Sequence, residues 1–425
     1  MPATSPALVG LAVILPPPAP LVGGHQRDPR GATSLLWRTA ISRRLIAVLS
    51  GIAVLAMLAA GCGRAPAAPG PASSIPAPRP ISTAPYQVGA YYFPGWPTLD
   101  KWKVLDAFPE RTPLLGYYRE GDPSVMDWQI KWAVEHGISF FAFDWYWDRG
   151  RRQLEHALHE GYFRARFRPY LKFCLLWANH NPPGSSSEAD LLAMTDYWIA
   201  NYFRQPDYLA IDGKPVVIIF TPRDLRRDMG TDGVRTAFTR MRERARSAGL
   251  PGIYIMGAAR ENTRLEALVH EGYDAGTGYN YPRAGMPDDT ALSAPYSAMV
   301  DGYEQIWYSI AVQRLIDYAP VTEPGWDSRP WHGDKALVRT GRDPEKFEDM
   351  LRRARVFTDR YPIAGGRKLV LIEAWNEPGE GAVIEPHRQW GFAHLDAVRR
   401  VFTRERGPHR DLTPADLGLA VPRAP

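Results

Sequence analysis

The sequence predicts an α/β fold, a single (β/α)8 TIM barrel, and two observations indicate it. From residue 86 onward, short β-branched or aromatic runs alternate with longer stretches of helical period, as expected of a parallel sheet wrapped by helices. Eight strand patterns fall within about 320 residues, the count and size typical of such a barrel. A doubly wound open sheet is the runner-up. It is disfavoured because an aromatic segment, Tyr91 to Trp96, follows the first strand where a glycine-rich phosphate loop would stand.

The elements follow one another in regular order. We expect strands at residues 88–93, 139–145, 170–177, 215–220, 252–257, 275–279, 319–322 and 368–375. Helical period marks residues 124–136, 187–203, 234–248, 298–318, 344–361 and 390–402. The barrel domain is therefore expected to span residues 86–408, followed by a C-terminal tail at residues 409–425.

The residues before the barrel predict export. We expect a leader and signal peptide at residues 1–61, because two arginines precede a 16-residue apolar run at residues 45–60, too short for a spanning helix. The small residues that lead into Cys62 resemble the lipobox of bacterial lipoproteins, which implies that this thiol is acylated. Cleavage without acylation and an uncleaved anchor are the alternatives. Residues 62–85 then form a Pro- and Ala-rich tether, so we expect a cell-envelope lipoprotein on the periplasmic or cell-surface side.

The charge and aromatic content favour a neutral polar partner over nucleic acid. The formal charge of +5 arises mostly before Cys62, and the rest of the chain carries 46 basic against 45 acidic residues. Nucleic acid requires clustered cations, which this balance does not provide. The 14 Trp and 20 Tyr residues suit sugars, on whose apolar faces aromatic rings stack, although filling the core is an equal explanation.

Candidate ligand-binding residues gather where the predicted strands end, because active sites of barrels lie at the carboxyl ends of the strands. These candidates are Tyr91, Tyr92, Asp144, Trp145, Asn179, Tyr279, Trp326, Asp327, Arg329, Trp375 and Asn376. Packing is an equal explanation for the two tryptophans Trp145 and Trp326, and pairing with a cation is one for Asp144. His180 is a weaker candidate of the same kind.

The last predicted strand opens into a loop that carries the candidate catalytic pair, Glu377 and Glu380. Asn-Glu-Pro is familiar from a clan of retaining glycosidases, but there the glutamate ends the fourth strand and here it follows the eighth. Two carboxylates three residues apart can act on one sugar, one protonated as acid and the other as base or nucleophile. Their mutual repulsion would raise one pKa. Helix capping and solvation of a turn are the alternatives for each residue alone, and we expect Glu385 to be structural.

Five motifs in order resemble glycoside hydrolase family 99 and its family-99-like relatives in bacterial polysaccharide loci, which are often labelled glycosyltransferases. They are Ala90 to Pro94, Phe143 to Tyr146, Trp177 to Asn179, Pro324 to Arg329, and Trp375 through Glu380 to Pro386.

The resemblance implies a retaining hydrolase of α-mannoside-like linkages that uses neither a metal nor another cofactor. It implies that Glu377 is a base that removes the proton of the sugar 2-hydroxyl, so that a 1,2-anhydro sugar forms. Glu380 then protonates the leaving oxygen and later activates water. The chain departs from the family at Pro378-Gly379, where a Trp usually follows the first Glu, and this leaves the substrate open. A transferase or transglycosylase of surface polysaccharide and a non-catalytic glycan-binding lipoprotein are the alternative functions.

Overall fold

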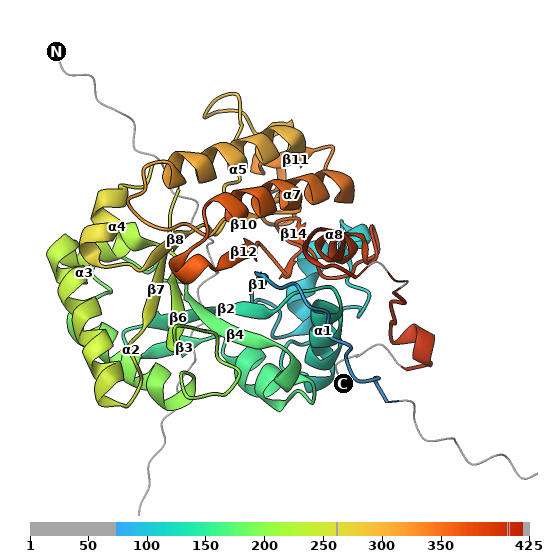
Figure 1. The fold of residues 1–425 in the computed structure, drawn as a ribbon. Helices are drawn as coiled ribbons and strands as arrows, with labels where there is room; N and C mark the ends of the chain where they lie inside the picture. Colours follow the sequence, from blue (N-terminus) through green and yellow to red (C-terminus); the bar gives the residue numbers. More distant parts are fainter. Residues whose placement is uncertain (1–73, 261, 406, 408, 420–425) are drawn as a thin grey trace, which may run out of the picture. The chain divides into compact units, whose positions relative to one another are not determined.

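The computed structural model describes residues 74–260, 262–405, 407 and 409–419, and these belong to one compact unit, Ser73–Pro425. Cys62, the predicted leader and the first half of the predicted tether lie outside the described residues. Within this unit, helices surround a central parallel sheet (Figure 1). The α/β fold class predicted from the sequence is confirmed.

Eight parallel strands form a nearly closed barrel. They are β1 (Tyr86–Tyr92), β2 (Phe140–Asp148), β4 (Lys172–Trp177), β6 (Lys214–Ile219), β7 (Tyr254–Ala258), β8 (Ala275–Thr277), β10 (Val321–Thr322) and β12 (Lys368–Ile372). Hydrogen bonding joins them in the order β10-β12-β1-β2-β4-β6-β7-β8. A single parallel bridge between Gly276 and Tyr318 closes the remaining seam. Each of these strands overlaps one of the eight predicted from the sequence.

The main helices lie outside the strands, as Figure 1 shows. They are α1 (Pro123–Glu135), α2 (Glu188–Asn201), α3 (Pro222–Ser247), α4 (Leu265–Glu271), α5 (Tyr296–Ala311), α7 (Pro344–Arg360) and α8 (Ala393–Phe402). The prediction missed the first part of α3, because Gly230 interrupts it with a φ of 69°. It also missed α4, whose seven residues are too few to display a helical period. None of the described helices is long and apolar enough to cross a lipid bilayer.

Besides several 3-10 turns, such as Pro109–Arg111, further short elements lie between these strands and helices. These are a hairpin strand β3 (Arg151–Gln153) beside β2, β5 (Ala210–Ile211) beside β6, the pair β9 (Ser293–Pro295) and β11 (Val338–Thr340), and the one-turn α6 (Arg329–His332). After β12 the chain forms a small antiparallel hairpin from β13 (Asn376–Glu377) and β14 (Ala382–Val383). The predicted last strand, which was expected to continue to residue 375, therefore ends at Ile372. The hairpin carries both predicted catalytic glutamates.

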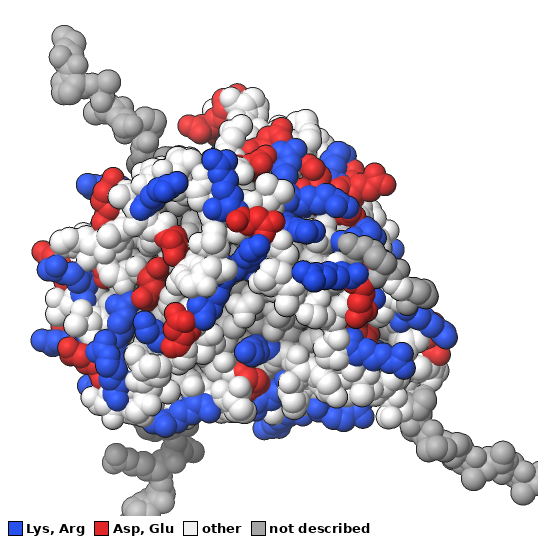
Figure 2. Space-filling model, viewed as in Figure 1, with Lys and Arg blue, Asp and Glu red and all other residues white. Residues whose placement is uncertain are grey.

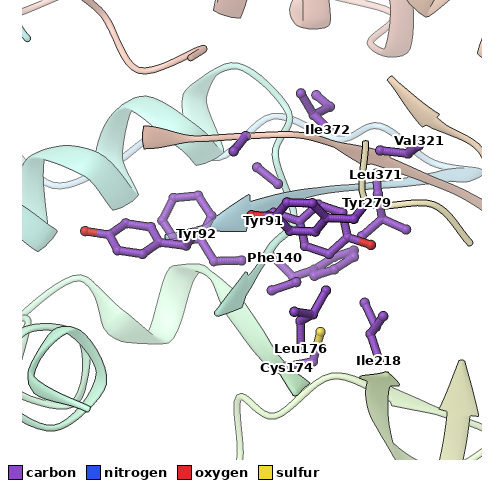
Figure 3. Packing of buried hydrophobic residues seen from close by; sticks show 14 of the residues in the cluster. Tyr91, Tyr92, Phe140, Cys174, Leu176, Ile218, Tyr279, Val321, Leu371 and Ile372 are labelled. Atoms are coloured by element: carbon purple, nitrogen blue, oxygen red, sulfur yellow. The ribbon is translucent and has the colours of Figure 1, made fainter. Parts of the chain in front are cut away.

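Side chains along each strand alternate between the barrel interior and the helices. Tyr91 of β1 contacts Tyr279 inside the barrel, with ring centroids 4.8 Å apart, whereas Tyr92 points the opposite way (Figure 3). The hydroxyl of Tyr92 donates to Gln129 of α1 at 3.0 Å. A Cβ at Gly89 would collide with the ring of Phe140, so the absence of a side chain there lets this ring fill the interior. The alternation decides which predicted site residues can reach a common ligand.

The surface of the unit matches the near balance of charge in the sequence. Lysine and arginine side chains are interspersed with aspartate and glutamate over the face in view in Figure 2. Many of them form ion pairs along or between helices, such as Arg353 of α7 with Asp301 and Glu304 of α5. Exposed pairs of this kind contribute little stability. The groups that bear on function are buried at the carboxyl ends of the strands.

Candidate active site

Three residues that the sequence predicted are joined directly inside the barrel rim. The hydroxyl of Tyr279, two residues beyond β8, lies 2.9 Å from the Asp144 carboxylate of β2 and 3.0 Å from the Glu377 carboxylate of β13. A phenol has one proton and can donate to only one of the two. When Tyr279 donates to Glu377, Asp144 completes the arrangement by being protonated and donating to the phenol oxygen. This chain of hydrogen bonds favours the ionised form of Glu377.

Two more carboxyl groups meet Glu377 at the same place. Oxygens of Glu373, Glu377 and Glu380 all lie within 4.8 Å of one another. Both oxygens of Glu373 are buried and have no hydrogen-bond partner among the described residues, and Glu377 and Glu380 each retain 7% exposure. The two candidate catalytic carboxyls are therefore neighbours, with oxygens within 4.8 Å of each other.

The electrostatics of the cluster separate the two glutamates. Burial raises the pKa of Glu377 to about 7, although the hydrogen bond from Tyr279 opposes the increase. Burial, together with the charge of Glu377, raises the pKa of Glu380 well above its ordinary value. No side-chain hydrogen bond from another described residue reaches Glu380 to offset this. The pair thus holds one carboxyl that ionises near neutrality and one that keeps its proton, an acid beside a base.

Burial and neighbouring carboxylates also raise the pKa values of Asp144 and Glu373 well above their ordinary values. Three carboxyl groups around one point are also a possible ligand set for a hard cation. The expectation that the protein uses no metal stays a prediction.

Two arginines, the buried Arg111 and the partly exposed Arg342, hold the backbone of the loop between β13 and β14. Arg111 donates to the carbonyls of Asp327 and Pro378, at 2.9 and 3.0 Å, and pairs with the Asp327 carboxylate at 2.5 Å. The N–H of Asp327 donates to the carbonyl of Glu380 at 2.6 Å. Arg342 donates to the carbonyl of Gly381 at 2.9 Å. These contacts fix the backbone that carries Glu380, so Asp327 acts on the loop rather than facing the carboxylate cluster.

A second set of contacts fixes Asn376, the residue before Glu377. Its side-chain amide exchanges hydrogen bonds with the backbone of Phe93 and donates to Glu120 at 2.9 Å. Glu120 is itself buried and accepts from the N–H of Trp96 at 2.9 Å. Every polar atom of the Asn376 side chain is therefore engaged with protein. Asn376 ties the first and last strands together and positions Glu377.

Other predicted ligand-binding residues serve as supports. Asn179 bridges the ends of β4 and β6 by two hydrogen bonds to the backbone of Thr221, at 2.7 and 2.9 Å. Tyr91 lies beneath Tyr279, fully buried, and donates to the carbonyl of Gly278 at 2.7 Å. Trp326 and Trp375 are also buried, and Trp375 packs on Phe141 with centroids 5.0 Å apart. Arg329 is half exposed and pairs with Asp327 at 2.6 Å.

Trp145 and Tyr92 face away from the carboxylate cluster. Trp145 follows Asp144 in β2, so the alternation of the strand turns its ring toward α2, where it packs on Tyr197 and Trp198. Its indole N–H donates to Glu155 at 3.0 Å. Of the two explanations that the sequence left open for Trp145, the structure favours packing. Tyr92 is likewise committed to α1.

The structure brings forward Tyr146 and Phe220, which the sequence did not single out as ligands, beside the weaker candidate His180. Tyr146 lies two residues beyond Asp144 on the same face of β2, and its pKa is raised by burial and then by the charges of Asp144 and Glu377. Aromatic contacts continue from Tyr146 to His180, then to Phe220, and then to Tyr279, at centroid distances of 6.0, 5.5 and 5.0 Å. Tyr146, His180 and Phe220 are partly exposed. Strand alternation from Asp144 was the signal that could have found Tyr146.

Trp331 of α6 is a further candidate beside the hairpin. Its ring is 44% exposed and stacks on Trp96 at 6.1 Å. A Cβ at Gly379 would collide with its indole, so the ring lies directly against the backbone of the loop. The aromatic surface that the sequence lacks after Glu377 is thus supplied from another segment. No pattern in the sequence indicated this contact, because Trp331 and Gly379 are 48 residues apart.

Comparison with known proteins identifies the family and the fold of this chain. Residues 108–398 match the family described as Glycosyltransferase WbsX. Proteins named WxcX from two strains of Xanthomonas campestris pv. campestris are each 30% identical to the chain over 314 residues, 68% of this chain and 43% of theirs. The chain thus spans less than half the length of these curated relatives.

Solved structures of similar fold include a family GH99 endo-alpha-mannosidase from Bacteroides thetaiotaomicron. It shares 15% identity and a TM-score of 0.54, and the match covers 74% of this chain and 95% of that one. A protein described as glycoside hydrolase-like shares 19% identity and a TM-score of 0.57 over 78% and 98% of the two chains. At these identities the likeness shows the fold, and it confirms the barrel. The resemblance drawn from the sequence motifs is confirmed by the same comparisons.

Proposed function

This chain belongs to the family described as Glycosyltransferase WbsX, and from that membership we propose that it is a glycan-active enzyme. From the site we propose that it hydrolyses glycosidic bonds. We propose further that it acts with retention on α-mannoside-like linkages of a polysaccharide or glycan. Both the family and the fold are associated by their descriptions with carbohydrate chemistry. The choice of hydrolysis depends on the site.

The observation that carries the proposal is the unequal pair Glu377 and Glu380. Glu377 accepts a hydrogen bond from Tyr279 and has a pKa of about 7, so a large fraction of it is ionised at neutral pH. Glu380, held to the loop by its backbone, has a pKa raised well above its ordinary value and stays protonated. Cleavage of a glycosidic bond needs one base and one acid in reach of the same sugar. The hairpin β13–β14 offers both.

In the first step, the Glu377 carboxylate removes the proton from the sugar 2-hydroxyl. The freed oxygen attacks the neighbouring anomeric carbon, and the bond from that carbon to the leaving oxygen breaks. Glu380 gives its proton to the leaving oxygen. The products of the step are a 1,2-anhydro sugar, the released alcohol, a protonated Glu377 and an ionised Glu380.

In the second step, Glu380 takes a proton from water, and the hydroxide oxygen attacks the anomeric carbon of the anhydro sugar. The bond to the 2-oxygen breaks, and Glu377 returns its proton to that oxygen. Two inversions at one carbon give overall retention. Both glutamates finish in the protonation states in which they began, so the proposed cycle closes without another reactant.

The mechanism constrains the substrate by stereochemistry. The 2-oxygen can displace the leaving group only when the two lie on opposite faces of the ring, as they do in an α-mannoside. In an α-glucoside they lie on the same face, and the displacement cannot occur. We therefore propose an α-mannoside or another sugar with the same 1,2-trans relation as substrate.

A glycosyltransferase or transglycosylase is the second candidate, because the family description names a transferase. Among the described residues no Asp-x-Asp pair follows a strand at the rim, where a metal-dependent nucleotide-sugar site would need it. A glycan-binding protein without catalysis is the third candidate. The products separate the three, since water as acceptor gives shorter chains, a sugar acceptor gives longer ones, and a binder gives neither.

The experiment is a panel of α-mannans, bacterial surface polysaccharides and matched α-glucans incubated with the full chain, with products followed by chromatography and NMR. We expect shorter products from an α-mannoside-like substrate and none from the α-glucans. Glu380→Gln is the matched variant, because it keeps the shape of the side chain while removing the proton donor. Equal product formation by this variant and the wild type would refute the proposal.

We also propose that the enzyme is exported and held at the membrane by a lipid on Cys62, which the signal-like run before this residue supports. Incorporation of labelled palmitate into the full chain, and its absence in Cys62→Ser, is the expected result. Labelling that persists in Cys62→Ser would contradict the anchor without affecting the catalytic proposal.

A further inference from the structure

A second group of chemically reactive side chains lies on the outer helices, apart from the carboxylate cluster. His136 follows α1 and precedes β2, at the amino end of that strand and so opposite the catalytic rim. Asp396 stands in the first turn of α8, which lies beside α1 (Figure 1). His409 and Asp411 come from the segment after α8. Three separate segments of the chain therefore converge on one point.

The distances within this group are those of ligands around a common centre. His136 Nε2 lies 3.2 Å from Asp411 Oδ1 and 3.6 Å from Asp396 Oδ1, and His409 Nε2 lies 3.0 Å from Asp411 Oδ1. Ligand atoms of His136, His409 and Asp411 are all within 4.8 Å of one another. Around a tetrahedral zinc ion with bonds of about 2.0 Å, neighbouring ligand atoms are about 3.3 Å apart. The observed spacings bracket this value.

The three nearest atoms do not satisfy one another. His136 Nε2, His409 Nε2 and Asp411 Oδ1 are all buried, and none has a hydrogen-bond partner of acceptable geometry among the described residues. The three atoms lie close together but are not oriented to hydrogen-bond one another. This is the arrangement expected of ligands around a common ion. Buried polar atoms without hydrogen-bond partners are costly, and a cation bound among these three would offset that cost.

The surroundings of His136 prepare it as a ligand. Its side chain is fully buried, and its Nδ1 lies 2.7 Å from the carbonyl of Trp132. That carbonyl can only accept, so the Nδ1 carries a proton, and a cation that displaces the second ring proton would meet the Nε2 lone pair where this nitrogen faces Asp411 and Asp396. Histidine ligands of metals are commonly oriented in this way by a backbone carbonyl. The ring also stacks on Phe392, with centroids 5.8 Å apart.

We propose that His136, His409 and Asp411 bind a divalent transition-metal cation of the Zn²⁺ class, with Asp396 beside His136 at the edge of the site. Imidazole nitrogens and carboxylate oxygens are the donors that zinc takes in tetrahedral sites. The cation fastens the segment around residues 409–411 to the end of α1, where Trp132 already donates to the carbonyl of Leu412 at 2.8 Å. The site is structural and separate from the catalytic rim.

The test is zinc binding by the full chain after dialysis against EDTA, measured by calorimetric titration with ZnCl₂ and by thermal unfolding. We expect about one Zn²⁺ per chain and a higher Tm with zinc, because a ligand that binds only the folded state stabilises it. His409→Gln should weaken binding by about 100-fold or more and abolish the rise in Tm. This partly exposed histidine is chosen because its replacement leaves the buried His136 in place.

His270→Gln is the matched control. His270 of α4 also pairs with an aspartate, Asp232, at 2.8 Å, but it belongs to no cluster of three such ligands among the described residues. Its replacement should leave zinc affinity unchanged. The proposal is overturned if the wild type binds no stoichiometric zinc, or if His409→Gln binds it as tightly. It is also overturned if binding is lost in Glu377→Gln instead, which would assign the ion to the catalytic carboxylates.

Discussion

Two kinds of buried carboxylate meet at the same hairpin. Asp327 supports the hairpin, whereas Glu377 and Glu380 are part of it, and the two kinds differ in what surrounds them. Asp327 is enclosed by Arg111 and Arg329. Burial opposes its ionisation, but the hydrogen bond from Arg329 and the charge of Arg111 outweigh burial and lower its pKa. Glu377 and Glu380 have no cation within ion-pair distance among the described residues, and their pKa values are raised. The carboxylates with cations fix the loop, and those without cations remain available for chemistry.

The contrast teaches that burial alone does not identify a catalytic residue in this protein. A buried carboxylate paired with arginine is stabilised as an ion and is unsuited to exchanging protons near neutral pH. A buried carboxyl among other carboxyls has a raised pKa and therefore exchanges protons near neutral pH. Its ionisation in this environment costs stability. The first group should therefore matter for folding and the second for activity, and each prediction below separates these two quantities.

The largest expected effect is on activity. Glu377→Gln and Glu380→Gln should each lower kcat/KM on an α-mannoside-like substrate by about 10²–10⁴-fold, because each removes a proton-transfer group. Neither variant should lose stability, because the amide removes an unfavourable buried charge at Glu377 and replaces a carboxyl that is already uncharged at Glu380. Steady-state kinetics and thermal unfolding on the same preparations check both statements. A variant that loses activity and stability together would place its residue in the supporting group.

Asp327→Asn should have the opposite profile. Arg111 is 1% exposed, and without the carboxylate it keeps only carbonyl acceptors and a long ion pair with the exposed Glu110 at 3.7 Å, so we expect a loss of about 3–5 kcal/mol in the free energy of unfolding. Denaturant unfolding measures it. The matched control is Asp232→Asn, which removes an exposed partner of Arg235 and should cost less than about 1 kcal/mol. Equal losses in the two variants would contradict the supporting role of Asp327.

The third prediction concerns the dependence of stability on pH. The pKa of Glu377 is about 7 in the folded chain, against 4.5 as its ordinary value. Between these values the unfolded chain releases the proton while the folded chain keeps it. The contribution of Glu377 to stability is therefore complete below pH 4.5 and is lost as pH rises through about 7, by about 3 kcal/mol.

The measurement is the unfolding free energy of the wild type and of Glu377→Gln across this pH range. The wild type should lose stability relative to the variant as pH rises. Parallel curves for the two proteins would show that burial does not raise the pKa of the Glu377 carboxyl, and would contradict this prediction. The same titration predicts that kcat/KM rises with pH through about 7, because the base must be ionised.

The smallest expected effect concerns Trp331, which contacts the hairpin but neither group of carboxylates. Trp331→Ala should raise KM about 5-fold with little change in kcat, because an exposed stacking ring contributes about 1 kcal/mol to binding. Tyr170→Ala is a control, since Tyr170 is also 44% exposed but precedes β4 at its amino end. A change in kcat alone would mean that Trp331 acts through the position of Gly379 rather than on the glycan.

Much of the fold could be predicted because strands and helices have local periods. The shared location of Asp144, Tyr279 and Glu377 could be predicted from one rule, because the carboxyl ends of the parallel strands lie on one side of a barrel. The assignment of faces was less certain, because a shift of one residue moves a side chain to the other side of a strand. The sequence therefore selected Trp145, while the structure turns Tyr146 toward the carboxylates.

The supporting contacts could not be predicted from the sequence. Arg111 comes from a short 3-10 turn between β1 and α1, and it acts on residues more than 200 positions later. Glu120 and Trp331 likewise meet the hairpin across long separations. Such contacts depend on how loops pack at the rim, and loops carry no period. The roles of Asn376 and Asp327 as supports followed only from their hydrogen bonds.

The central claim is that Glu377 and Glu380 act as base and acid on one sugar ring. It is tested most directly by kcat/KM for an α-mannosyl fluoride, whose leaving group needs no proton. The account predicts that Glu380→Gln cleaves this substrate at nearly the wild-type rate, while Glu377→Gln remains inactive. Equal losses in both variants, or full activity in Glu377→Gln, would contradict it.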